Sequence, residues 1–187
     1  YFLYYCSIFK MIFTKNILQM IKNFFLLTVF ALLFSCKSDT NVQSDITDEN
    51  QKFLDNCETV QAYLDDFVDE SVDYKKYFND TCKIRNTSFN SDGSMTVDDR
   101  ISRHKKLWPK YDFSISDSIN FLPGVNAETK QVDGSVRFYF NWTIINSENE
   151  KSVTVPLYMS FDFDKNGKFI FQQHFGDISA AFLSLEE

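Results

Sequence analysis

Four polar side chains fall on faces of the chain that are otherwise apolar: His104 in an expected helix, and Asp117, Gln173 and Asp177 in expected strands. Burial of a carboxylate in apolar surroundings is costly, and it raises the pKa until the group can exchange a proton near neutral pH. Asp177, Asp117 and His104 are therefore the candidate catalytic residues, and the chemistry open to them is proton transfer beside a carbonyl.

Each of these three residues also has a purely structural interpretation. Asp177 suits the cap of a short last helix, "DISAAFLSL", and Asp117 suits a bulge or a strand end that faces water. His104 also suits a core histidine whose ring nitrogens make hydrogen bonds within the fold. The residue types alone leave both interpretations open.

The register of the last expected hairpin decides on which face of the sheet the side chains of Gln173 and Asp177 lie. The segment 164–168, "DKNGK", suits a three-residue loop with Gly167 in the left-handed conformation. A two-residue loop would reverse every assignment, because a one-residue slip moves each side chain to the other face. Counting back from the longer loop pairs Phe163 with Phe169, Phe161 with Phe171 and Met159 with Gln173, and it directs Phe175 and Asp177 inward and His174 outward.

Helical patterns precede the strand patterns along the chain. From about Asp48 an amphipathic helix is expected, followed by a shorter helix at "DYKKYFND" and a brief strand at "CKIRNTSF". A further helix is expected over "TVDDRISRHKKLW", with Thr96 as its cap and Pro109 as its end. The expected inward face of the first helix comprises Phe53, Cys57, Val60, Leu64 and Phe67.

After Pro109 the hydrophobic period changes to two. Alternating segments cover 111–121, 135–145, 152–163 and 168–177, joined by short turns. Such segments predict an antiparallel sheet with one apolar face. Helices first and a strand meander afterwards predict an α+β fold, with the helices covering that face.

This order of elements, ending in "DKNGKFIFQQHFGD", resembles the nuclear transport factor 2-like superfamily, in particular its SnoaL-like branch. The resemblance covers 49–187 and implies a cone-shaped fold with a pocket between a curved antiparallel sheet and the amino-terminal helices. Isomerases and cyclases of the superfamily use pocket carboxylates, and Asp177 matches the terminal-strand Asp by position. The isomerase pattern also requires a Tyr donor, and none of Tyr63, Tyr74, Tyr77 and Tyr139 is assigned to it.

The sequence therefore predicts a ligand pocket that needs no cofactor and no metal. Our leading hypothesis is a non-catalytic domain that binds a small apolar ligand or an envelope partner; the alternative is a SnoaL-like isomerase or cyclase. A homodimer through the outer sheet face, with Tyr139, Tyr158, Ile145 and Ile170, is a further expectation. The expected pocket residues are His104, Trp108, Phe140, Trp142, Met159, Gln173 and Asp177.

The amino-terminal segment predicts where in the cell the protein lies. A short apolar run, 24–35, ends in "LFSC", which resembles the lipobox of bacterial lipoproteins and makes Cys36 the acylated residue. An ordinary signal peptide or a buried helix with an accidental cysteine is the alternative. We expect residues 1–35 to be upstream residues and signal peptide, with Met20 or Met11 as the start, and 36–48 to be a flexible tether. Lys37 does not resemble an inner-membrane retention signal, which favours the outer membrane of the cell envelope.

Charge, cysteine content and one acidic segment bear on nucleic-acid binding, on a disulfide and on metal sites. Without the three lysines before Cys36, 16 basic residues face 26 acidic ones, a net charge of about −10, which argues against nucleic-acid binding. Outside the cytoplasm, Cys57 and Cys82 could form a disulfide worth about 3.5 kcal/mol, or remain two reduced thiols; their spacing is no zinc motif. "DFDKNG" at 162–167 resembles the start of a calcium loop, but its twelfth position is Gln173, and a hairpin turn explains the same residues.

Overall fold

The computed structural model describes residues 40–85, 87, 93–116 and 118–186. The chain divides into two compact units, Tyr1–Val42 and Gln43–Glu187, and of the first unit only the start of a helix is described. The expected signal peptide, Cys36 and Asp117 lie outside the described residues. Among the helices of the described part, none combines the length and apolar character needed to cross a bilayer.

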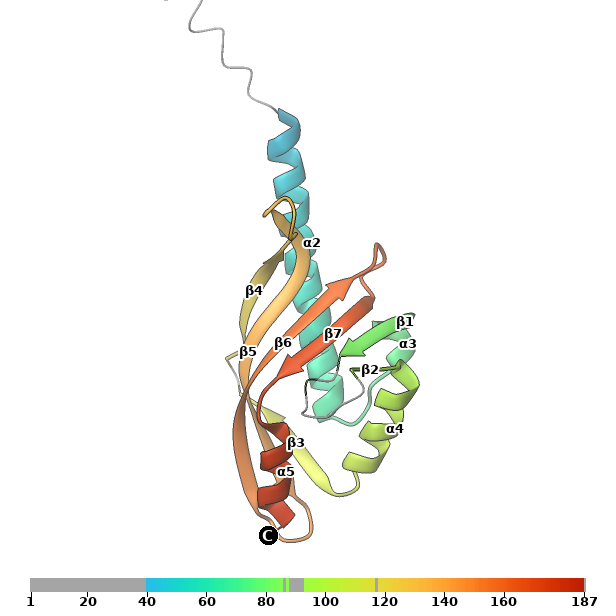
Figure 1. The fold of residues 1–187 in the computed structure, drawn as a ribbon, viewed down its shortest axis with the longest axis vertical. Coiled ribbons are helices and arrows are strands. Elements are labelled where there is room, and N and C mark those ends of the chain that lie inside the picture. Colours follow the sequence, from blue (N-terminus) through green and yellow to red (C-terminus); the bar gives the residue numbers. More distant parts are fainter. Residues whose placement is uncertain (1–39, 86, 88–92, 117, 187) are drawn as a thin grey trace, which may run out of the picture. The chain divides into compact units, whose positions relative to one another are not determined.

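Seven described strands form one curved sheet that stays open (Figure 1). Their spatial order is β2-β1-β7-β6-β5-β3, and β4 also pairs with β5. The strands are β1 (Phe78–Arg85), β2 (Ser94–Met95), β3 (Tyr111–Ile115), β4 (Asn120–Val125), β5 (Val132–Asn146), β6 (Ser152–Phe163) and β7 (Phe169–Phe175).

The strand pairing differs from the expected meander at two places. The segment 111–121 forms two strands, β3 and β4, which pair with opposite ends of the long strand β5. All neighbours are antiparallel except β1 and β7, which run parallel. A parallel pair needs a long connection, and here most of the domain lies between the two strands.

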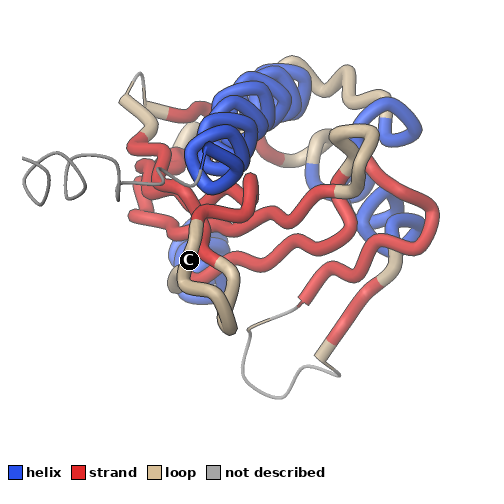
Figure 2. The backbone as a smooth tube through the Cα atoms, turned by 90° about the horizontal axis from the view of Figure 1, so that it is seen from above, coloured by secondary structure: helices blue, strands red, loops and turns tan. Residues whose placement is uncertain are grey.

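Four described helices accompany the sheet: α2 (Thr40–Val68), α3 (Tyr74–Tyr77), α4 (Val97–Leu107) and α5 (Ile178–Glu186). Figure 2 shows α2 lying across one face of the sheet. Phe67 of α2 contacts Phe113 of β3 and Trp142 of β5, with ring centroids 5.1 and 6.5 Å apart. The predicted α+β fold, a curved sheet covered by helices, is confirmed.

Helix α2 begins earlier than the sequence pattern suggested. Residues 36–48 were expected to be a flexible tether, but the helix starts at Thr40. No Gly or Pro interrupts 40–48, and extending a helix that is already nucleated costs little. The helix therefore replaces the tether from Thr40 onward.

The inward face of the sheet is set by the register of β5 and β6. Phe138 lies opposite Met159, Phe140 opposite Leu157, and Trp142 opposite Val155. All six side chains are buried, as the period-two pattern predicts.

The last hairpin has the predicted loop but not the predicted register. Gly167 has a φ of 74°, and the Asp164 N–H donates to the Lys168 carbonyl over 2.8 Å, as expected. Phe163 pairs with Phe169, but the next pair joins Asp162 to Phe171, so β7 holds one extra residue. This β-bulge reverses the expected assignment of everything beyond it: Gln172 and His174 face inward, whereas Gln173 and Phe175 do not.

Candidate functional site

A cavity lies between the helices and the inner face of the sheet. It encloses ≈ 80 Å³ in which the centre of a water molecule fits. This is room for several water molecules or for the body of a small organic ligand. Its walls come from α2, α4, α5, β3, β5, β6 and β7. The lining residues are Tyr63, Leu64, Phe67, Arg100, Arg103, His104, Leu107, Ile115, Phe140, Trp142, Leu157, Met159, Gln172, His174, Ile178 and Phe182.

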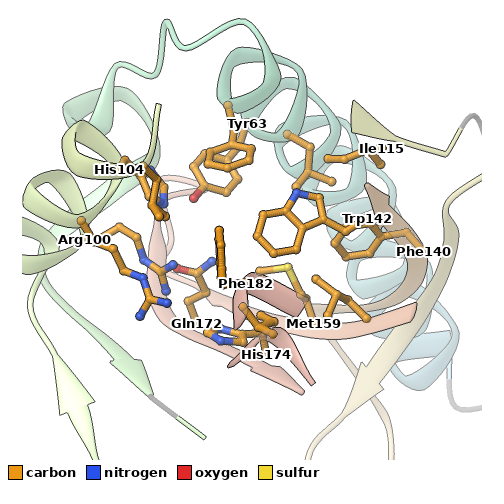
Figure 3. A pocket seen from close by; sticks show the side chains of 16 residues that line it. Tyr63, Arg100, His104, Ile115, Phe140, Trp142, Met159, Gln172, His174 and Phe182 are labelled. Atoms are coloured by element: carbon orange, nitrogen blue, oxygen red, sulfur yellow. The ribbon is translucent and has the colours of Figure 1, made fainter. Parts of the chain in front are cut away.

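The polar groups gather on one side of this cavity. Figure 3 shows Arg100, Gln172 and His174 together on one side, and Trp142 and Phe140 across from them. Helix α4 supplies Arg100, and β7 supplies Gln172 and His174. The cavity is therefore amphipathic, with a polar wall facing an apolar one.

Local sequence explains why α4 presents Arg100 to the cavity. Thr96 and Asp99 form a capping box: Thr96 Oγ1 accepts from the Asp99 N–H at 3.2 Å, and Asp99 Oδ2 accepts from the Thr96 N–H at 2.9 Å. The box fixes where the helix begins. Arg100 and His104, four residues apart, then lie on one helix face, and both are buried.

Arg100 is a buried cation that forms no ion pair with the described residues. It is 8 % exposed, and its Nε and Nη2 atoms make no hydrogen bond with any described residue. Burial lowers the pKa of Arg100, and the nearby Arg103 adds to this effect. The described lining contains no Asp or Glu that could compensate the charge. An unpaired buried charge is expensive, so this guanidinium is the least satisfied group of the site.

The two cavity histidines are neutral at physiological pH. Burial, followed by the charges of Arg100 and Arg103, lowers the pKa of His104 to about 3 and that of His174 to about 4. His104 Nδ1 lies 2.6 Å from the Tyr74 hydroxyl. Because burial raises the pKa of Tyr74, we assign the phenol as the donor, which leaves the imidazole proton on Nε2.

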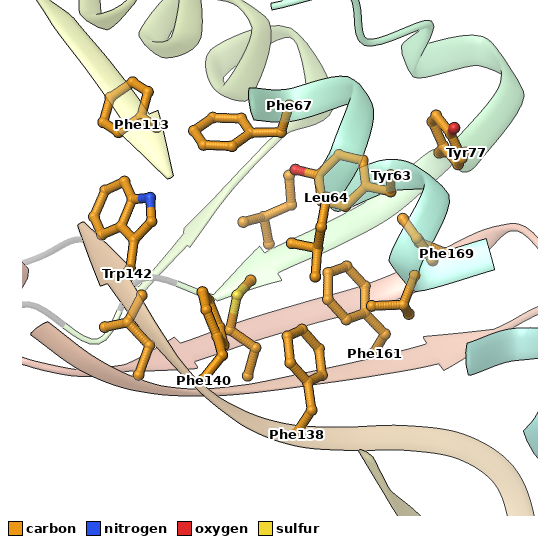
Figure 4. Packing of buried hydrophobic residues seen from close by; sticks show 14 of the residues in the cluster. Tyr63, Leu64, Phe67, Tyr77, Phe113, Phe138, Phe140, Trp142, Phe161 and Phe169 are labelled. Atoms are coloured by element: carbon orange, nitrogen blue, oxygen red, sulfur yellow. The ribbon is translucent and has the colours of Figure 1, made fainter. Parts of the chain in front are cut away.

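Beside the cavity the interior is filled by aromatic rings (Figure 4). We call this region the aromatic core: Tyr77, Phe78, Phe138, Phe161 and Phe169, all at most 2 % exposed. Tyr63 forms the boundary, since it lines the cavity and also packs edge-on against Tyr77, Phe78, Phe161 and Phe169. The hollow is thus confined to the α4 side of Tyr63.

Of the pocket residues expected from sequence, His104, Phe140, Trp142 and Met159 line the cavity. Trp108 instead packs behind it, with its ring centroid 5.3 Å from that of His104 and 6.1 Å from that of Phe67. Its indole Nε1 is buried without a hydrogen-bond partner in the described part of the chain.

Gln173 and Asp177 do not line the cavity. The bulge in β7 turns Gln173 away, and Asp177 is exposed after the strand has ended. Asp177 Oδ1 accepts from the Ala180 N–H at 3.3 Å, so this carboxylate caps α5, as its structural interpretation requires. Proton transfer by Asp177 inside the cavity has no support from this geometry.

Sequence reasoning missed Arg100, Gln172 and His174. Arg100 stands one helical turn before His104, and this spacing was a usable signal once His104 was expected to face inward. Gln172 and His174 had no such signal, because the bulge that turns them inward leaves no distinctive residue in the sequence.

Of the two alternatives for the cysteines, the structure has the reduced thiols and not the disulfide. Cys57 and Cys82 are free thiols, on α2 and β1. Burial raises the pKa of Cys57 to about 11 and that of Cys82 to about 12, which keeps both protonated and unreactive at neutral pH.

The segment 162–167, which resembles the start of a calcium loop, forms the end of β6 and the following turn. Asp164 Oδ1 accepts from the Asn166 and Lys168 N–H groups at 2.8 and 3.0 Å, and Oδ2 accepts from the Asn79 amide at 3.0 Å. Across the described residues, no group of three His, Cys, Asp or Glu side chains is placed to hold a metal ion.

The outer face of the sheet carries a small aromatic patch. Tyr139 and Tyr158 lie 4.9 Å apart, and Phe175 lies 6.1 Å from Tyr158. Tyr139 and Phe175 are about half exposed. Ile170 is exposed at the other end of β7, and Ile145 is half-buried.

Comparison with known proteins gives likeness in structure only. No protein-family model matches the sequence, and no curated protein does. A candidate isomerase from Bacillus subtilis superposes with a TM-score of 0.55 at 12% identity, covering 70% of this chain and 94% of that one. A candidate polyketide cyclase from Xanthomonas campestris gives 0.54 at 13% identity, with 73% and 98% covered.

An LEH-like epoxide hydrolase from M. tuberculosis gives a TM-score of 0.52 at 15% identity, with 70% and 89% of the two chains covered. At such identities these matches establish the arrangement of elements and no activity. The open curved sheet, the helices over its inner face and the cavity between them agree with these structures. The chain therefore has the cone-shaped nuclear transport factor 2-like fold.

Proposed function

We propose that this protein is a lipid-anchored binding protein of the bacterial cell envelope that holds a small, mainly apolar molecule in its cavity. The observation that carries the binding function is the cavity itself, which is lined largely by aromatic and aliphatic side chains and large enough for a small ligand. Ligand sites are commonly concave and apolar, with a few convergent polar groups. Arg100, Gln172 and His174 supply those groups here.

Native mass spectrometry of the purified protein tests this function. We expect the wild type to retain a small molecule, and the cavity-filling variant Met159→Trp to lose it. Leu183→Trp, at a position on α5 that is 67 % exposed, adds the same ring outside the cavity and is the matched control. A wild type that retains no molecule, and whose melting temperature no small apolar compound raises, would argue against ligand binding.

The anchoring part of the proposal rests on the sequence around Cys36. The apolar run before it and the polar, acidic chain after it suit acylation at this cysteine, and several acyl chains give durable attachment. Replacing Cys36 with Ser should move the protein from the membrane to the soluble fraction of fractionated cells. Unchanged fractionation would contradict the anchor without affecting the binding function.

A second candidate function is proton transfer by His174, as in an isomerase or cyclase. The specific observation is that neutral His104 and His174 share the cavity with Arg100, a cation that would stabilise an enolate. The named isomerase and cyclase among the structural neighbours agree with this class of chemistry. The described lining offers no carboxylate for it, and His104 Nδ1 already accepts from Tyr74, so His174 is the base.

Deuterium exchange tests this second candidate. Phenylacetone in D2O should gain deuterium beside its carbonyl faster with the wild type than with His174→Gln, while exposed Arg85→Met should behave as the wild type. Equal incorporation with and without protein would remove the catalytic candidate.

A further inference from the structure

The polar wall of the cavity has an unfilled hydrogen-bonding requirement. Arg100 is more than nine-tenths buried, yet its Nε and Nη2 atoms have no partner among the described residues. No Asp or Glu stands beside it in the described lining. Buried polar groups are almost always satisfied, so an unpaired buried guanidinium indicates a missing anion.

We infer that the ligand carries a carboxylate, which pairs with the guanidinium of Arg100 while its apolar body lies against Trp142 and Phe140. This inference rests on the proposed binding function and names the class of its ligand. It follows from the unpaired guanidinium, from the charge of the lining, and from the position of the apolar wall.

A guanidinium presents its N–H donors in pairs along its edges. Such a pair matches the spacing of the two oxygens of a carboxylate, which gives a bidentate, charge-assisted pair. A hydroxyl or a carbonyl offers only one oxygen to an edge, so the guanidinium favours a two-oxygen acceptor.

The charge of the lining favours a monoanion. Arg100 is the buried cation, Arg103 is only half-buried, and both histidines are neutral because burial lowers their pKa. A phosphate monoester brings up to two negative charges and three oxygens, more than one buried guanidinium compensates. A carboxylate matches the single buried charge, and a cationic ligand would be repelled.

The apolar wall limits the body of the ligand. Trp142 and Phe140 lie across the cavity from Arg100, with Met159 beside them (Figure 3). A ligand with its head at Arg100 therefore directs its other end toward aromatic rings. A short arylalkyl acid fits both the polarity and the space.

A matched ligand series tests the inference by calorimetry. The full chain is held in lipid nanodiscs, with empty nanodiscs as the blank, and titrated at pH 7.5 with 3-phenylpropanoate, 3-phenylpropanol, 3-phenylpropylamine and 3-phenylpropyl phosphate. All four share one apolar body. We expect the carboxylate to bind about 10- to 100-fold more tightly than the alcohol, since hydrogen bonds to charged groups are the stronger ones, and the amine to bind least.

Substitutions of Arg100 test whether this residue causes the preference for the carboxylate over the alcohol. Arg100→Met should bind the carboxylate no better than the alcohol, and Arg100→Lys, which keeps the charge but not the paired edge, should retain only part of the preference. Exposed Arg85→Met should retain all of it. Binding of the alcohol by Arg100→Met shows that this variant still folds.

The outcomes separate the two proposals. Equal affinity of wild type for carboxylate and alcohol would overturn the inference and leave the binding function standing, because water would then satisfy Arg100. Tighter binding of the phosphate than of the carboxylate would also overturn it. Binding of none of the four compounds would count against the ligand pocket itself.

Discussion

The aromatic core and the cavity lie side by side on the same sheet face but are built in opposite ways. Phe138, Phe161 and Phe169 meet ring to ring, at centroid distances of 4.4 to 5.9 Å, and leave no space. In the cavity wall, Arg100 of α4 and Gln172 of β7 face the interior and leave donors and acceptors unsatisfied among the described residues.

The difference shows that stability and binding are divided between neighbouring parts of one interior. A filled aromatic region buries apolar area, the main favourable term in folding. The region around the cavity is less tightly packed and contains an uncompensated charge, and both lower the stability of the fold in the absence of a ligand. Substitutions in the two regions should therefore change stability with opposite signs.

The largest expected effect belongs to the aromatic core. Phe161→Ala should lower the free energy of unfolding by about 3–5 kcal/mol, because it removes a fully buried ring and leaves a void. Urea denaturation measures this. Leu183→Ala, at an exposed position, should change stability by no more than about 0.5 kcal/mol. A loss below 1 kcal/mol for Phe161→Ala would mean that the core is not tightly packed.

Acid should weaken the cavity region selectively. An unfolded His has a pKa of about 6.5, whereas the pKa is about 3 for His104 and about 4 for His174 in the fold. Between pH 6.5 and 4 the unfolded chain therefore binds more protons, and stability falls as pH falls. At pH 5 each histidine should account for a loss of roughly 2 kcal/mol relative to pH 7.5.

Urea denaturation at pH 7.5 and pH 5 measures this dependence. The stability difference between pH 7.5 and pH 5 should be about half as large in His174→Gln as in the wild type. In Phe161→Ala it should be unchanged. Identical pH dependence of the wild type and His174→Gln would show that His174 is not held neutral by burial.

Removing the buried cation should stabilise the unliganded protein. Arg100→Met replaces an unpaired charge by an apolar side chain of similar length, and we expect the free energy of unfolding to rise by about 1–3 kcal/mol. Thermal unfolding measures the change, with Arg85→Met as the control that stays near wild type. Destabilisation by Arg100→Met would indicate that the guanidinium is better satisfied than its contacts suggest.

The smallest expected effect is at the start of α4. Thr96→Ala removes one half of the capping box and should cost about 1 kcal/mol. Because α4 carries Arg100 and His104, the same change should weaken binding of 3-phenylpropanoate. Thr59→Ala, at a half-buried position in the middle of α2, makes the same change away from any helix end and should lower neither stability nor binding. A Thr96→Ala variant as stable as Thr59→Ala would show that the box does not set the helix start.

The sequence predicted most of the fold because its signals are periodic and local. Alternation placed Phe138, Phe140 and Trp142 on one face of β5, and the Thr96 cap located α4. The polar wall was not predictable in the same way. Arg100 is charged, and charge by itself argues for exposure; Gln172 faces inward only because β7 holds one unpaired residue, which tertiary packing decides.

The bulge in β7 has a consequence at the level of the gene. Loss of the single codon for Ile170 would straighten the strand and still leave Gln172 and His174 facing the helices. Loss of the codon for Gln173, three positions later, would bring the ring of Phe175 to the place of the His174 imidazole. The polarity of the cavity wall can therefore change through one in-frame deletion, with no substitution in any lining residue.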